Sequence, residues 1–93
     1  AAASVFTFLR KCGTEQLLIA VNMTPVERYD YWVGMPEQSA WELVLSSEDK
    51  AFGGSGFEAV ESAETDEHET AGHKNRLRLN LPGLSVLIYK RTD

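Results

Sequence analysis

NRLRLNLPGLSVLIYK, residues 75–90, is the stretch that decides the fold. Every second residue from 77 to 81 is leucine, so the leucines share one face of an extended strand while Arg76 and Arg78 point to the other. A proline and a glycine follow and favour a turn. The β-branched and aromatic residues of 85–90 predict a returning strand. The stretch therefore predicts an antiparallel strand pair with one face buried.

The same period of two recurs in the first half of the chain. Residues 4–10 (SVFTFLR) and 16–22 (QLLIAVN) predict a hairpin, with Gly13 free to take a positive φ in its turn. Residues 17–21 form an unbroken apolar run, so this second strand is expected to be covered on both faces. An isolated two-layer sandwich would leave its outer face more polar, which indicates that something else covers it.

Two further strands are expected at 29–34 and 40–45, and the second opens the stretch WELVLSSEDKAFGGSG (41–56). Alternation places Trp41, Leu43 and Leu45 on one face, where they are expected to join the core. The glycines of 53–56 do not form a phosphate loop, because no lysine and no helix pattern follows them. They predict a close-approach turn instead.

Residues 52–74 show no period and are rich in Gly, Glu, Ser, Thr and Ala, so this segment is predicted to be irregular. About six short strands then remain, with turn signals between them and no convincing helix. This pattern predicts an all-β fold, an antiparallel β-sandwich with Greek-key connections. At 93 residues the chain is expected to form one domain, residues 1–93, with a modest core.

The composition excludes several classes of partner. Nine basic and fourteen acidic residues give a net charge of -5, which argues against nucleic acid and anionic membranes as partners. No apolar run approaches the ~18–20 residues that cross a bilayer. Cys12 is the single cysteine, which excludes an internal disulfide and is typical of a protein of the reducing cytoplasm.

No residue pattern supports catalysis or a metal centre. The carboxylates concentrate between Glu58 and Glu69, on the segment predicted to be irregular, where solvated charge is expected. Cys12 has no evident partner base, and no serine lies in a nucleophile elbow. The spacing of His68 and His73 matches no standard zinc motif. We expect no catalytic residues, no metal and no cofactor in this chain.

Exposed aromatic residues are the remaining candidates for function. An aromatic ring stacks on the C–H groups of a sugar, so a surface tryptophan is a candidate carbohydrate contact. Trp32 points away from Tyr31 and Val33, to the other face of its strand. Trp32, Tyr29 and Phe57 are therefore the candidate carbohydrate-contact residues. For Trp32, packing between domains is the alternative.

Taken in order, the motifs of this chain resemble the C-terminal all-β domain of bacterial 1,4-alpha-glucan (glycogen) branching enzymes, in the alpha-amylase superfamily. NMTPVER (22–28) is close to the family's Asn-Phe-Thr-Pro-Val-Pro-Arg, and YWVGMP (31–36) follows its Tyr-x-x-Gly-x-Pro. The Trp-Glu pair, the glycine turn and LPGL (81–84) then appear in the family's order. The chain departs from the family at 46–49 and at Trp32, where a polar or basic residue is common.

The resemblance implies a non-catalytic accessory role. In such enzymes a separate (β/α)₈ barrel carries the catalytic carboxylates, cuts an α-1,4 glucan and forms an α-1,6 branch. The partner that the resemblance implies is this catalytic barrel in the same parent chain, with alpha-glucan as a further partner. Two alternatives stay open, a stand-alone carbohydrate-binding module and a protein-interaction sandwich. An excised domain would expose the face that the barrel covers, so we expect it to self-associate.

Overall fold

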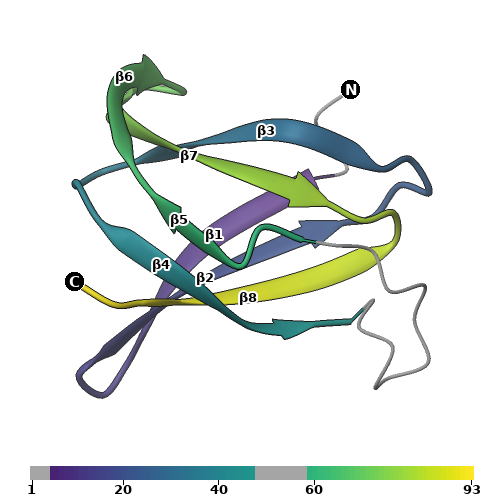
Figure 1. Ribbon diagram of the computed structural model, residues 1–93, viewed down its shortest axis with the longest axis horizontal. Helices are drawn as coiled ribbons and strands as arrows, with labels where there is room; N and C mark the ends of the chain where they lie inside the picture. Colours follow the sequence, from purple (N-terminus) through teal and green to yellow (C-terminus); the bar gives the residue numbers. More distant parts are fainter. Residues whose placement is uncertain (1–4, 48–58) are drawn as a thin grey trace.

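The computed structural model describes residues 5–47 and 59–93, which form eight β-strands and no helix (Figure 1). The strands are β1 (Val5–Cys12), β2 (Glu15–Asn22), β3 (Arg28–Met35), β4 (Ala40–Ser46), β5 (Ser62–Glu64), β6 (Asp66–Thr70), β7 (His73–Leu81) and β8 (Ser85–Arg91).

The strands form two antiparallel sheets that pack as a sandwich. One sheet has five strands in the order β1-β2-β8-β4-β5, and the other has three in the order β3-β7-β6. The chain crosses between the sheets after β2, β3, β5 and β7, so that β8 comes to lie between β2 and β4 (Figure 1). These connections confirm the predicted Greek-key sandwich.

The core follows the predicted alternation. Leu77, Leu79 and Leu81 are fully buried between the sheets, and Trp41 and Tyr89 are the largest side chains beside them. The indole Nε1 of Trp41 donates a hydrogen bond to Ser39 Oγ (2.8 Å), which satisfies the one polar group of this buried ring. The prediction that Trp41 belongs to the core is confirmed.

One end of the sandwich is tied together by the side chain of Asn22, which is almost fully buried. Its Nδ2 donates to the carbonyl oxygens of Val26 (2.9 Å) and Pro82 (3.0 Å). Its Oδ1 accepts from the amide of Thr24 (3.0 Å) and from the Thr24 hydroxyl (2.7 Å). A single side chain thus holds the loop after β2 against the turn before β8.

The prediction of an irregular segment over 52–74 is wrong for its second half. Residues 62–64 and 66–70 are strands, joined at Thr65 where the chain passes from one sheet to the other. A tight turn with positive φ at Ala71 and Gly72 pairs β6 with β7. The sequence of β6 shows no apolar pattern because β6 is an edge strand and buries almost no side chain. The first residues of the segment, 52–58, lie outside the described part of the chain.

The expected position of Leu45 is also wrong. Leu43 pairs with Tyr89 and Leu45 with Ile88, so one extra residue, Val44, is inserted in β4. Such a bulge moves all later side chains to the opposite face. Leu45 therefore points outward, and Ser46 takes the buried position instead.

Tyr89 makes the fold sensitive to alkaline pH. Burial raises the pKa of its phenol to about 12, against an ordinary value of 10.0. The folded state then holds the proton above pH 10 while the unfolded state releases it, so stability is full below pH 10 and falls as pH rises. We expect a loss of about 1.5 kcal/mol between pH 10 and about pH 11.5. Urea unfolding across this range measures it.

The matched control for this loss is Tyr89→Phe. The variant gives up the hydrogen bond from the phenol to the Val60 carbonyl (2.5 Å) at every pH, but it has no proton to lose. Its stability should therefore fall less steeply than that of the wild type above pH 10. Parallel curves for the two proteins would contradict the assignment.

Candidate functional site

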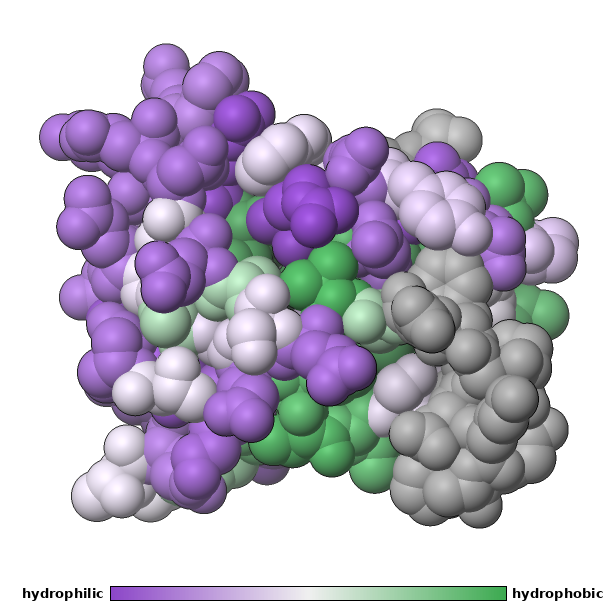
Figure 2. Space-filling view, viewed as in Figure 1, coloured by the Kyte–Doolittle hydropathy of each residue, from purple (hydrophilic) through white to green (hydrophobic). Residues whose placement is uncertain are grey.

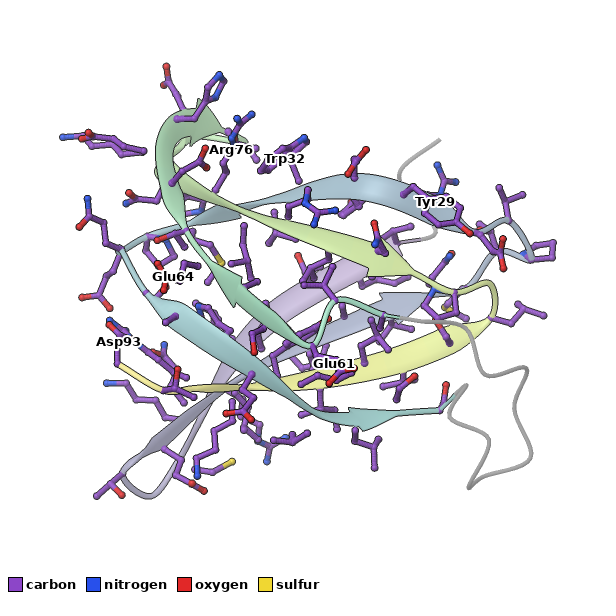
Figure 3. The ribbon with its side chains drawn as sticks, in the orientation of Figure 1. Tyr29, Trp32, Glu61, Glu64, Arg76 and Asp93 are labelled. Atoms are coloured by element: carbon purple, nitrogen blue, oxygen red, sulfur yellow. The ribbon has the colours of Figure 1, made fainter. Side chains whose placement is uncertain are left out.

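The structure places the predicted carbohydrate-contact residues at separate positions. Trp32 is 38% exposed and lies on the outer face of the three-stranded sheet, while Tyr31 and Val33 face the core as expected. Tyr29 is 63% exposed near the start of β3 and lies well apart from Trp32 (Figure 3). Phe57 lies outside the described residues. Tyr29 and Trp32 therefore do not form one aromatic platform.

The side chain of Tyr29 is hydrogen bonded to the loop that precedes β3. Its hydroxyl donates to Glu27 Oε1 (3.3 Å). Partial burial raises the pKa of Tyr29, and the neighbouring carboxylate of Glu27 raises it further.

Trp32 is stacked against an ion pair. The guanidinium of Arg76 lies 3.7 Å from the centroid of the indole ring. Arg76 also donates from Nε to Asp66 Oδ1 (3.0 Å) and from Nη2 to Asp66 Oδ2 (3.3 Å). These hydrogen bonds lower the pKa of the Asp66 carboxyl. The bidentate contact fixes the guanidinium in a plane that suits stacking.

A second ion pair lies beside Trp32. In the sheet register Trp32 is opposite Arg78, whose Nη1 donates to Asp30 Oδ1 (3.0 Å). Asp30 has a positive φ (51°) within a bulge of β3, and its amide donates to Asn80 Oδ1 (3.0 Å). The bulge aims the carboxylate toward Arg78. We call Trp32, Arg76, Asp66, Arg78 and Asp30 together the tryptophan cluster.

Sequence reasoning found only part of this cluster. The outward positions of Trp32, Arg76 and Arg78 follow from alternation. Asp66 was missed because the segment that contains it shows no strand period. Asp30 was missed because a bulge produces no pattern of apolar residues from which it could be predicted.

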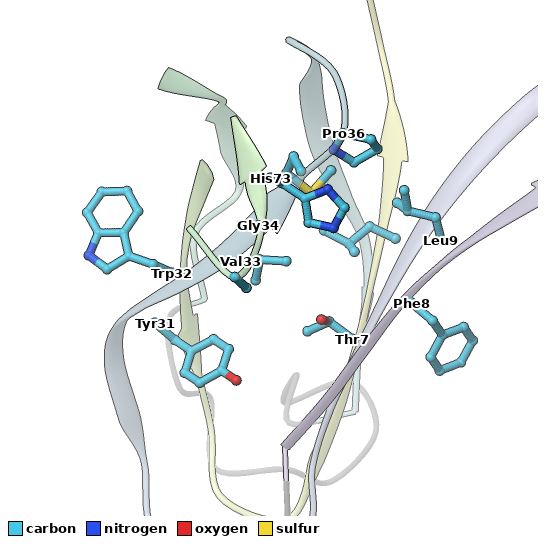
Figure 4. A pocket seen from close by; sticks show the side chains of 12 residues that line it. Thr7, Phe8, Leu9, Tyr31, Trp32, Val33, Gly34, Pro36 and His73 are labelled. Carbon is cyan, nitrogen blue, oxygen red and sulfur yellow. The ribbon is translucent and has the colours of Figure 1, made fainter. Parts of the chain in front are cut away.

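A cavity of about 380 Å³ opens between the edge strands β1 and β3 (Figure 4). Polar and apolar groups both line it, and Thr7, Tyr31 and His73 are among its polar residues. Trp32 lies at its rim, with its ring turned away from Tyr31. Among the described residues that line this cavity there is no carboxylate. It therefore has no pair of acids for glycoside chemistry.

The outer face of the five-stranded sheet is apolar. Phe6 and Phe8 of β1 point outward and are 48% and 49% exposed, while the smaller Val5, Thr7 and Leu9 point inward. Paired residues of neighbouring strands share a face, so the register extends this surface in two rows. The rows are Phe6–Val21–Val86 and Phe8–Ile19–Ile88–Leu45. We call these seven residues the apolar face.

Charged residues border the apolar face on one side. The next row of the same sheet pairs Arg10 with Leu17, Leu17 with Lys90, and Lys90 with Glu42. Lys90 also forms an ion pair with Glu15 (2.6 Å). Hydrophilic side chains also gather around β6 (Figure 2). An apolar centre with a charged border is the usual anatomy of an interface.

The acidic residues of 61–69 are all exposed. Within 5–47 and 59–93, no three His, Cys, Asp or Glu side chains come together in a way that could hold a metal ion. Over these same residues, no helix has the length and apolarity that crossing a membrane requires.

The fold and the surfaces together define the class of protein. It is an antiparallel β-sandwich domain with one apolar outer face. A family model described as "Alpha amylase, C-terminal all-beta domain" matches residues 1–92. The chain belongs to this family, which confirms the resemblance seen in its motifs.

Several curated relatives are branching enzymes. The chain is 42% identical over 89 residues to 1,4-alpha-glucan branching enzyme GlgB of Aquifex aeolicus, covering 94% of this chain and 14% of that protein. It is 42% identical over 90 residues to the enzyme of the same name from Pseudomonas syringae pv. syringae, covering 96% and 12%. It is 37% identical over 76 residues to the enzyme of the same name from Vibrio parahaemolyticus, covering 82% of this chain and 10% of that protein. The chain thus spans only a small part of the length of these relatives.

Proposed function

We propose that this chain is the non-catalytic C-terminal accessory domain of a cytoplasmic 1,4-alpha-glucan branching enzyme, and that its apolar face packs against the catalytic barrel of the same parent protein. In glycogen biosynthesis that parent would form α-1,6 branches by transferring glucan chains. The accessory domain would stabilise the barrel and contribute no catalytic carboxylate.

One observation carries this proposal, the presence of large apolar side chains on the outside of the five-stranded sheet. Phe6 and Phe8 would be more stable inside, yet the alternation of β1 turns both rings outward. Burying apolar surface is worth roughly 25 cal/mol per Å², so two half-exposed rings represent a sizeable gain on docking. A monomeric domain rarely exposes so continuous an apolar surface.

The barrel is the partner that fits this surface. The relatives are branching enzymes in which the matching segment is 10–14% of the length, so a covering partner would be available within the same chain. The unbroken apolar run of residues 17–21 supports the same view, since Leu17, Ile19 and Val21 of β2 are only half-buried without a partner.

The proposal predicts that the isolated chain associates with itself through the apolar face. In sedimentation equilibrium, the weight-average mass should rise as concentration goes from the micromolar to the millimolar range. The double variant Phe6→Ser/Phe8→Ser should remain monomeric over the same range, because it removes the two largest exposed rings of the face.

Trp32→Ser is the matched control, since it removes an exposed aromatic ring from the outer face of the other sheet. It should associate like the wild type. A wild-type chain that stays strictly monomeric at the highest concentration, or a Trp32→Ser variant that alone loses association, would count against the proposed face.

A further inference from the structure

The outer face of the three-stranded sheet differs in kind from the apolar face. Its centre is one indole ring with an arginine–aspartate pair on either side, Arg76–Asp66 and Arg78–Asp30. The strands alone place them there, because Trp32 pairs with Arg78, and Arg76 pairs with Asp66, in the registers of β3, β7 and β6.

The cluster is open to solvent where it matters for binding. The carboxylates of Asp66 and Asp30 have 58% and 70% of their side-chain surface exposed. Arg76 is the most covered member, at 23%, because it lies over the ring and is held by Asp66. It therefore acts as a support, while Trp32 stays 38% exposed and both aspartate side chains stay largely exposed.

The charges of the cluster cancel. Each guanidinium has its own carboxylate at 3.0 Å, so the surface around Trp32 has no net positive field to attract a phosphate or another anion. What it offers is both hydrogen-bond donors and acceptors next to an aromatic face. Hydroxyl groups can use both kinds, since each donates one hydrogen bond and accepts others.

This combination suits a neutral polyhydroxy ligand. Sugar C–H groups can rest on the exposed part of the indole while neighbouring hydroxyls donate to the aspartates and accept from the arginines. We propose that the tryptophan cluster is a surface contact site for an α-1,4-glucan chain, separate from the apolar face. The choice of this glucan rests on the proposed function, since the relatives act in 1,4-alpha-glucan branching by name.

The two tryptophans of the chain make a direct test possible. In a ¹⁵N-edited NMR titration with maltoheptaose, the indole N–H signal of Trp32 should shift in a saturable way. The indole of Trp41 is buried and donates to Ser39, so its signal should stay in place. Inorganic phosphate at the same concentration should move neither. A Trp32 signal that ignores maltoheptaose, or that responds to phosphate instead, would overturn the proposal.

Variants separate this site from the apolar face. In affinity electrophoresis through glycogen gels, Trp32→Ala should bind about tenfold more weakly than the wild type. Asp66→Asn should also weaken binding, because it breaks the pair that holds Arg76 over the ring. Met23→Ala removes an exposed side chain that belongs to neither surface and should be retarded like the wild type. Thermal unfolding of each variant checks that it is folded.

The outcomes distinguish the two proposals. A chain that self-associates through Phe6 and Phe8 but migrates unretarded in glycogen would remove the glucan site and leave the accessory role intact. A chain retarded through Trp32 that never self-associates would remove the docking face alone. Equal retardation of the wild type and Trp32→Ala would show that glucan contacts another surface, which also overturns the inference.

Discussion

Replacing Asn22 by alanine is expected to lower the free energy of unfolding by about 4 kcal/mol, because it removes four hydrogen bonds from one corner of the sandwich. The variant loses two hydrogen bonds donated to the carbonyls of Val26 and Pro82 and two accepted from Thr24. The Pro82 carbonyl still accepts from the Ser85 hydroxyl, and the Val26 carbonyl still accepts from the Thr24 hydroxyl (3.3 Å). The Thr24 amide loses its bond to Asn22 Oδ1. A smaller side chain also leaves a void at a site that is 1% exposed.

Thermal unfolding of Asn22→Ala measures this loss, which corresponds to roughly 20 °C in Tm for a domain of this size. Met23→Ala is the matched control, because the neighbouring side chain is 62% exposed and should cost less than about 0.5 kcal/mol. If Asn22→Ala melted within a few degrees of Met23→Ala, the corner would not depend on this side chain.

Gly34→Ala is expected to cost about 3 kcal/mol for a different reason, overpacking against main chain. A Cβ at Gly34 would overlap the carbonyl oxygen of Thr70 and would lie 3.0 Å from Cδ2 of His73. The oxygen belongs to the β6–β7 hairpin, so it cannot turn aside as the end of a flexible side chain could. The substitution must push this hairpin away from β3.

Gly72→Asn controls for the general cost of replacing a glycine in this hairpin. Gly72 has φ of 84°, a conformation that asparagine tolerates better than most residues, and nothing lies within 4 Å of its added Cβ. Urea unfolding should show a loss of less than about 1 kcal/mol for Gly72→Asn. Equal losses for the two variants would contradict a steric role for Gly34.

Strands with a buried face could be predicted from the sequence, and strands without one could not. The alternating leucines of β7 and the outward Trp32 of β3 are placed correctly, because burial imposes a period of two on the residues. β6 (DEHET) is held by its ladder with β7 and by the turn at Ala71 and Gly72. Neither the ladder nor the turn produces a hydrophobic pattern, so this strand cannot be predicted from the periodicity of the sequence.

Bulges limit the prediction in a similar way. The extra residue at Val44 reverses the face of Leu45, and the bulge in β3 brings Asp30 to Arg78. A bulge is a property of pairing between two strands, and one strand read alone does not contain it. The tryptophan cluster depends on two registers, those of β3 with β7 and of β6 with β7, for the same reason. The apolar run of β2 predicts that its outer face is covered, and this stays a prediction. The register of the hairpin adds the outward rings of β1 to the same face.

The central claim is that the apolar face packs on a catalytic barrel of the same parent protein. Hydroxyl-radical footprinting of side chains tests it most directly, on the isolated chain and on the protein encoded by the whole native gene. We predict that oxidation of Phe6 and Phe8 falls about fivefold or more in the larger protein, because the centre of an interface excludes water, while oxidation of Trp32 is unchanged. Equal oxidation of Phe6 and Phe8 in the two proteins would contradict the account.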